Sequence, residues 1–213
     1  MQYLEIIFDT ETKKFFDDIE GYDPGKLGVS ITSVYARTLD NSFHEVQGKM
    51  QSFWEEDFAE MFKLFEKADR IIGFNSITFD VPALSPYLPP HWSKLKHFDI
   101  LAQIKDVAGK RMSLDSLAKA TLGTKKNDTG VNAIKYWNEG TEESFAKLKK
   151  YCEMDVTITR DIYDHVLKNG LLKYTDFWNE IREIKLDFSY PKEGSSTVQS
   201  SLFSLAGWRT RDF

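Results

Sequence analysis

The sequence predicts an α/β domain built around a mixed β-sheet. The predicted elements run strand, strand, strand, helix, strand and then mainly helix, an order typical of this class. With 213 residues, 41% of them hydrophobic, the chain is long enough to bury a full core. We therefore expect one compact domain over residues 1–190 and a C-terminal tail over residues 191–213.

The predicted strands occupy the first third of the chain. Residues 3–9 alternate, with Leu4, Ile6 and Phe8 on one side, which indicates a strand. Turn residues follow. Residues 28–39, rich in β-branched side chains, and residues 42–50 then form an antiparallel pair.

The helical part begins with residues 54–69, whose apolar stripe consists of Phe58, Met61, Phe62 and Phe65. Residues 70–75 form a short buried strand, and residues 78–90 form a brief helix that prolines break. Residues 97–109 come next, before a helix that Ser113 caps and Gly123 ends. The longest helix runs from about Thr141 to Lys168 and stops at Gly170.

Composition excludes several classes of protein. A single cysteine, Cys152, excludes a disulfide framework, and with four scattered histidines it forms no zinc-type pattern. The N-terminus turns acidic too early for a signal peptide, and no apolar run approaches a membrane span. We expect a cytoplasmic protein without a membrane partner. Its net charge of −5 argues against coating nucleic acid by bulk charge, although basic pairs such as Lys110–Arg111 are either phosphate contacts or solvated surface.

The first polar motif is FDTE, at the end of the first strand. If the extended geometry continues, Asp9 and Glu11 point to the same face. Two adjacent carboxylates repel each other, so such a pair favours a divalent cation between them. The pattern alone is weak, because Asp18 and Glu20 repeat it in a turn-rich stretch, where we interpret it as an ordinary loop pair.

The second motif is GFNSITFD, which follows the short buried strand. A strand-to-helix connection there delivers Asn75, Phe79 and Asp80 to the edge of the sheet. The alternative is that Asp80 serves only the dipole of the next helix.

The third motif is YCEMD, inside the long helix. We expect the buried side of that helix to consist of Phe145, Leu148, Cys152, Ile158, Ile162 and Val166. Tyr151 and Asp155 are four residues apart and share a face at its edge. A buried carboxylate needs a cation, hydrogen bonds or water nearby, whereas the alternative is a surface Asp155 paired with Lys or Arg.

In chain order, FDTE, N-x-x-x-F-D and Y-x-x-x-D resemble the three exonuclease motifs of the DEDD superfamily of 3′-to-5′ exonucleases. The tyrosine resembles that of the tyrosine branch (DEDDy), in its bacterial or phage form. The resemblance covers about residues 3–168. It implies an RNase H-like fold, a mixed five-stranded sheet flanked by helices.

The resemblance also implies a two-metal mechanism that releases nucleoside monophosphates, with Mg²⁺ or Mn²⁺ as the two ions. By similarity, Asp9 bridges the ions, Glu11 and Asp155 complete the first, and Asp80 holds the second through water. Tyr151 orients the attacking water. Thr10, Asn75 and Phe79 are the candidate substrate contacts. For Asn75 and Phe79, we favour a role in supporting the turn before Asp80 over a direct part in the reaction. Asp99 is either a helix cap or a group that supports the metal ligands.

Two other functions remain open. One is a non-catalytic nucleic-acid-binding scaffold of the same fold, and the other is an endonuclease on that fold. The sequence leaves open whether the substrate is DNA or RNA and whether it is single- or double-stranded; we favour a single-stranded 3′ end, of DNA.

The tail contains Gln199, Leu202 and Phe203 in the spacing of a short motif by which bacterial replication and repair proteins dock on the sliding clamp. Ser200 departs from the usual second residue. The alternative is that the tail packs on its own domain. A clamp encircles a duplex, so docking there favours DNA as the substrate.

Overall fold

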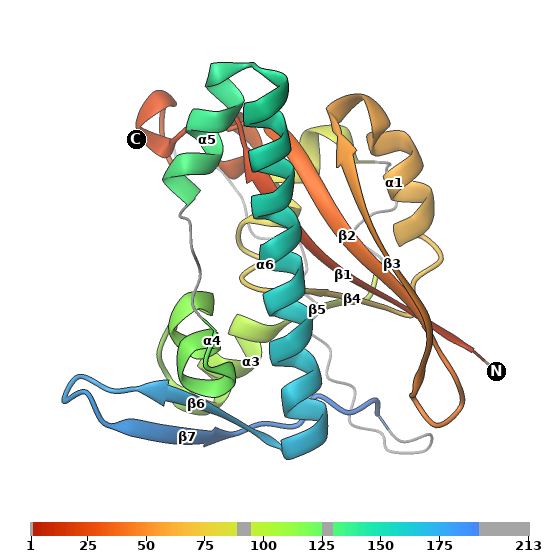
Figure 1. Cartoon of the computed structure of the whole chain (residues 1–213), viewed down its shortest axis with the longest axis vertical. Helices are drawn as coiled ribbons and strands as arrows, with labels where there is room; N and C mark the ends of the chain where they lie inside the picture. Colours follow the sequence, from red (N-terminus) through yellow and green to blue (C-terminus); the bar gives the residue numbers. More distant parts are fainter. Residues whose placement is uncertain (1, 89–94, 125–129, 192–213) are drawn as a thin grey trace, which may run out of the picture.

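The computed structural model describes residues 2–88, 95–124 and 130–191. Five strands form one sheet in the order β3-β2-β1-β4-β5 (Figure 1). Their bounds are β1 (Tyr3–Thr12), β2 (Val29–Leu39), β3 (Glu45–Trp54), β4 (Arg70–Gly73) and β5 (His97–Asp99). β2 pairs antiparallel with β1 and β3, and β4 pairs parallel with β1 and β5. The predicted mixed five-stranded sheet is therefore confirmed.

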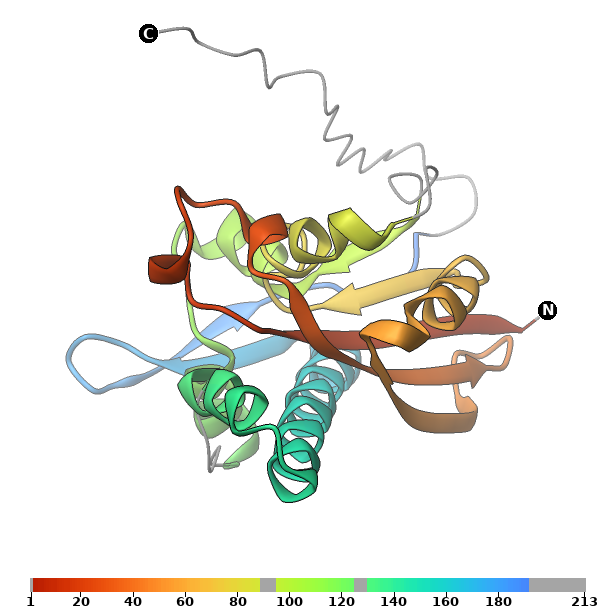
Figure 2. The same cartoon turned by 90° about the horizontal axis from the view of Figure 1, so that it is seen from above.

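Helices flank this sheet, as predicted. They are α1 (Phe58–Phe65), α2 (Asp80–Leu84), α3 (Ile100–Ala108), α4 (Leu114–Leu122), α5 (Gly130–Glu139) and α6 (Glu142–Asn169). Short 3-10 helices are η1 (Phe16–Asp18), η2 (Pro24–Lys26), η3 (Glu55–Asp57) and η4 (Ser85–Tyr87). A separate antiparallel hairpin of β6 (Leu171–Thr175) and β7 (Ile181–Lys185) extends away from the five-stranded sheet (Figures 1 and 2).

The alternation of side chains along β1 divides the core between two faces of the sheet. Ile6 and Phe8 pack with α1 and α2 on one face. Ile7 packs on the other face with α3, α4 and α6. Because successive strand residues point to opposite faces, Asp9 falls on the side of Ile7, toward α6.

Several predicted boundaries in the first half need correction. The strand predicted at residues 42–50 is β3, Glu45–Trp54, and the strand predicted at residues 70–75 is β4, which ends at Gly73. β1 continues past Asp9 to Thr12, because Thr10 and Glu11 still pair with β2. The helix predicted from residue 54 begins only at Phe58, since Trp54 is the last residue of β3 and η3 lies between them. The apolar stripe of α1 is buried as predicted.

The long helix α6 keeps its predicted boundaries. The Thr141 side chain accepts a hydrogen bond from the Ser144 backbone N–H at 3.1 Å, and Gly170 ends the helix in the left-handed conformation, with a φ of 69°. Such a C-cap favours glycine, which carries no Cβ to clash. The prediction for Phe145 was wrong, because its ring is only half-buried. It packs against Trp54 and Trp137 where the helix begins.

A buried polar network joins β1 to α6 at the end of the strand away from Asp9. Glu5, with no exposed surface, accepts hydrogen bonds from Arg37 Nε at 2.8 Å and from the Tyr163 hydroxyl at 3.0 Å. Arg37 also donates twice to the Asp164 carboxylate, at 2.9 and 2.7 Å. Glu5 and Arg37 compensate each other's buried charge, and removal of either one leaves the other uncompensated.

Candidate active site

Three separate segments of the chain meet at the C-terminal end of β1. A pocket of about 400 Å³ opens there, and its lining includes the carboxylates of Asp9, Glu11, Asp80 and Asp155. They come from β1, the start of α2 and the middle of α6. The candidate substrate residues Thr10, Asn75 and Phe79 line the same pocket. Residues predicted from three distant motifs therefore lie around one cavity.

Asp9 and Glu11 lie next to Cys152 of α6. One carboxylate oxygen of Asp9, one of Glu11 and the sulfur of Cys152 all lie within 4.8 Å of one another. The Cys152 thiol donates to the backbone carbonyl of Asp9 at 3.4 Å. Burial raises the pKa of this thiol well above its usual value, and the charges of Asp9 and Glu11 add to the rise. The thiol therefore stays protonated and supports Asp9 as a hydrogen-bond donor.

Asp80 reaches the edge of β1 because β4 ends early. β4 pairs with Glu5–Ile7 and stops at Gly73, where a Cβ atom would come within 2.5 Å of the Ser76 side chain. The chain thus folds back closely over Gly73 and brings Asp80 to β1. There its carboxylate accepts a hydrogen bond from the backbone N–H of Thr10.

Asp80 is only 4% exposed, and its environment disfavours the charged form. Burial raises the pKa of Asp80 to about 7, and the negative charges of Asp99 and Asp155 add to the rise. Hydrogen bonds from the backbone N–H groups of Asp80 and Thr10 oppose it. A buried carboxylate near other carboxylates has an elevated pKa because burial and like charges disfavour its ionised form more than these hydrogen bonds favour it.

Asp155 and Tyr151 lie inside the protein rather than at the edge of α6. Each is 5% exposed, so the alternative of a surface Asp155 was wrong. Burial raises the pKa of Tyr151 beyond its usual range, and the charges of Asp155, Glu11 and Asp9 raise it further. Tyr151 is also hydrogen-bonded to Asp155. Its hydroxyl therefore remains protonated next to three carboxylates.

The turn between β4 and α2 explains the remaining motif residues. Asn75 has a φ of 64°, and its side-chain oxygen accepts hydrogen bonds from Arg111 at 2.9 Å and from Thr78 at 2.7 Å. Phe79, not Asp80, occupies the N-cap position of α2, and Asp80 lies in the first turn, where its charge also favours the helix dipole. Asp99 caps α3. The Thr10 hydroxyl lies 3.1 Å from that of Thr32.

Some residues at this pocket were not predicted from the sequence. The lining also includes Lys14, Phe15, Phe16, Val131 and Ile134. The spacing of Val131, Ile134 and Trp137 is an apolar helical pattern that would have identified α5. Asp18, the last residue of η1, and Glu20 just after it are both exposed, as expected of an ordinary surface pair.

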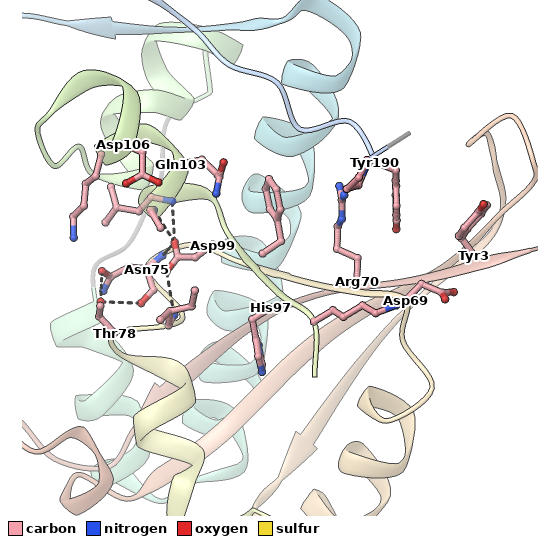
Figure 3. A pocket seen from close by; sticks show the side chains of 17 residues that line it. Tyr3, Asp69, Arg70, Asn75, Thr78, His97, Asp99, Gln103, Asp106 and Tyr190 are labelled. Atoms are coloured by element: carbon pink, nitrogen blue, oxygen red, sulfur yellow. Dashed lines mark hydrogen bonds between the residues drawn. The ribbon is translucent and has the colours of Figure 1, made fainter. Parts of the chain in front are cut away.

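A larger pocket, of about 930 Å³, lies along β5 and α3 (Figure 3). Asn75 lines both pockets. Asp69, Asp99 and Asp106 line the larger one, but Asp69 accepts a hydrogen bond from the Leu4 backbone N–H and Asp99 accepts several from the backbone. The converging carboxylates are at the smaller pocket, which is therefore the candidate active site.

A family model described as the RNase H superfamily matches residues 6–167. The chain belongs to the RNase H superfamily. No curated protein matches it. Membership in the RNase H superfamily agrees with the mixed five-stranded sheet and points to a nuclease-type hydrolase that acts on nucleic acid and uses divalent metal ions.

Two further predictions concern a membrane-spanning helix and the clamp-like motif of the tail. Among residues 2–88, 95–124 and 130–191, no helix is long and apolar enough to span a bilayer. The clamp-like motif of Gln199, Leu202 and Phe203 lies outside the described residues, as does the tail from residue 192 onward.

Proposed function

We propose that this RNase H superfamily member is a metal-dependent 3′-to-5′ exonuclease of the tyrosine branch, with DNA as the favoured substrate. One observation carries the proposal. The carboxylates of Asp9, Glu11, Asp80 and Asp155, from three separate segments, line one pocket, and Tyr151 is hydrogen-bonded to Asp155. The spacing of these residues in the sequence is that of the tyrosine-branch motifs.

The donor set fits hard divalent cations. Its ligand atoms are carboxylate oxygens, which suit Mg²⁺ and Mn²⁺. The pKa of Asp80 is raised by burial and then by the nearby charges of Asp99 and Asp155, so a cation bound at this pocket would favour its charged form. Asp9, Glu11, Asp80 and Asp155 would hold two such ions, which when bound supply hydroxide near neutral pH and stabilise the leaving 3′ oxygen.

The side chains of this protein supply position. The Thr10 N–H orients Asp80, and the Cys152 thiol holds the backbone of Asp9. Because its hydroxyl proton is donated to Asp155, the Tyr151 oxygen can accept a hydrogen bond from the water that attacks the phosphodiester and so orient it.

An aromatic surface borders the carboxylates. The rings of Phe79 and Phe16 pack edge to face, with their centroids 6.2 Å apart, and both residues line the pocket. Aromatic rings stack on nucleic-acid bases without regard to sequence, at about 1–3 kcal/mol per base. This surface fits the base of an unpaired terminal nucleotide, which supports a single-stranded 3′ end as the substrate. Asn75, at the other side of the turn, is a further candidate contact.

A time course with 5′-labelled single- and double-stranded DNA and RNA tests the function. Stepwise shortening from the 3′ end in Mg²⁺, stopped by a chelator, is the expected result. Internal cuts would identify an endonuclease, and binding without turnover would identify a scaffold.

Matched variants connect the activity to the pocket. Glu11→Gln and Asp155→Asn should abolish hydrolysis in the folded protein, because each removes a charged ligand. Glu20→Gln alters the same kind of residue in the exposed second copy of the motif and should leave hydrolysis unchanged. Full Mg²⁺-dependent activity in the Glu11 or Asp155 variant would contradict the proposed site.

A further inference from the structure

One buried carboxylate outside the candidate site, that of Asp99, holds the turn that carries Asp80. Asp99 is the last residue of β5 and is 3% exposed. Its Oδ1 accepts a hydrogen bond from the Asn75 backbone N–H at 2.9 Å, and its Oδ2 accepts one from the Ile77 N–H at 3.0 Å. Figure 3 shows Asp99 beside this turn. Both carboxylate oxygens therefore bind the backbone just before Asp80.

The turn has a conformation that needs such support. The φ of Asn75 is 64°, in the left-handed region. Within the turn, the Phe79 N–H donates to the Asn75 carbonyl at 3.1 Å. Non-glycine residues in sparsely populated backbone regions persist when surrounding groups fix them. The bonds from Asp99 supply that constraint at two points.

The same carboxylate also caps α3. Its Oδ1 accepts from the backbone N–H groups of Leu101, at 2.9 Å, and Ala102, at 3.2 Å. An N-cap needs only one acceptor oxygen, as Ser113 demonstrates for α4, where its hydroxyl accepts from Ser116 at 3.2 Å. Capping therefore explains one oxygen of Asp99, and the second oxygen serves the turn alone.

We propose that Asp99 is a positioning residue for Asp80. By joining the turn of residues 75–79 to the first turn of α3, it sets where the Asp80 carboxylate lies relative to Asp9 and Asp155. This inference rests on the proposed function, which makes Asp80 a metal ligand. Groups that orient metal ligands typically change metal affinity or activity by roughly 10–100-fold when they are removed.

Two substitutions separate positioning from capping. Asp99→Ser keeps a good N-cap for α3 but is too short to bind both points of the turn. Asp99→Asn keeps the Oδ1 acceptor and places an amide N–H₂ opposite the Ile77 N–H. The control is Ser113→Ala, which removes the N-cap of the next helix, α4.

The measurement is Mn²⁺ binding by calorimetry to the folded full-length protein without substrate, followed by the Mg²⁺ dependence of hydrolysis. Asp99→Ser should raise the dissociation constant for Mn²⁺ at least about tenfold, and Asp99→Asn should raise it less. Ser113→Ala should leave it unchanged. A shift in metal affinity of the folded protein is not expected from a lost helix cap.

Unchanged Mn²⁺ affinity and Mg²⁺ dependence in folded Asp99→Ser would overturn the inference. If that variant does not fold, unchanged values in Asp99→Asn would do the same. A parent protein that binds Mn²⁺ but hydrolyses nothing would refute the proposed function, while the comparison of affinities still decides the role of Asp99. A parent that binds no divalent cation would overturn both.

Discussion

Replacing Asp80 by asparagine should stabilise the metal-free protein, although it should also remove the proposed activity. The pKa of Asp80 is raised to about 7, whereas an unfolded aspartate titrates near 3.9. The folded state therefore binds this proton more tightly than the unfolded state. The associated stability is fully present below the unfolded pKa and is lost as the pH rises through the folded value.

The size of the effect follows from the shift. A difference of about three pKa units corresponds to a destabilisation of roughly 4 kcal/mol at pH 8, and of about 1.5 kcal/mol at pH 5. For a domain of this size, 4 kcal/mol is on the order of 10 °C in melting temperature. Asparagine carries no charge but retains one oxygen that can accept from the Thr10 N–H. The free energy of unfolding of Asp80→Asn should thus exceed that of the parent most clearly above pH 7.

The assay is urea unfolding of parent and variant in chelator at pH 5 and pH 8. We expect a larger stability difference at pH 8, and we expect saturating Mg²⁺ to stabilise the parent more than the variant. Equal stability of the two proteins at pH 8 in chelator would refute the reasoning, because Asp80 would then carry its charge without penalty.

Three further predictions concern other parts of the molecule. Tyr151→Phe should lower the hydrolysis rate while Mn²⁺ affinity stays nearly intact, because its hydroxyl orients water and is not a ligand; an unchanged rate would make Tyr151 a packing residue. Burial lowers the pKa of His97 to about 4. In urea unfolding, the parent should therefore lose up to about 3 kcal/mol of unfolding free energy relative to His97→Gln as the pH falls from about 6.5 to 4. Unfolding free energies of the two proteins that vary in parallel with pH would contradict this. Deleting residues 195–213, or changing Leu202 and Phe203 to Ala, should abolish binding to a bacterial sliding clamp in a pull-down and leave hydrolysis of free oligonucleotides unchanged, and a parent protein that binds no clamp would exclude this role.

The sequence predicts the elements with clear periodicity and clear ends. The boundaries of α6 follow from Thr141 and Gly170, and the apolar stripe of α1 follows from its spacing. β5 was not assigned, because His97–Asp99 is too short to show alternation. Its place in the sheet comes from parallel pairing with β4, which is a contact between segments and has no local signal.

The sequence predicted which residues form the candidate site, but not how deeply they are buried or which backbone groups they contact. Each motif alone had an ordinary alternative, and only their co-occurrence favoured a site. The burial of Asp155 depends on how α6 lies on β1, which no helix pattern specifies. Similarly, the contact of Asp99 with the turn of residues 75–79 and the thiol contact of Cys152 involve backbone groups far away in the chain, which carry no residue-specific signal.

The buried network around Glu5 fixes α6 at a point distant from Asp155, so a small rotation at that point moves Asp155 by a larger distance. Tyr163, which that network holds, is eight residues beyond Asp155, or about 12 Å along the helix axis. A pivot of about 5° at Tyr163 would therefore carry Asp155 sideways by about 1 Å, a displacement that can cost roughly 100-fold in rate. The accuracy of the proposed catalytic geometry is thus set partly at the opposite end of the sheet, where no substrate needs to bind.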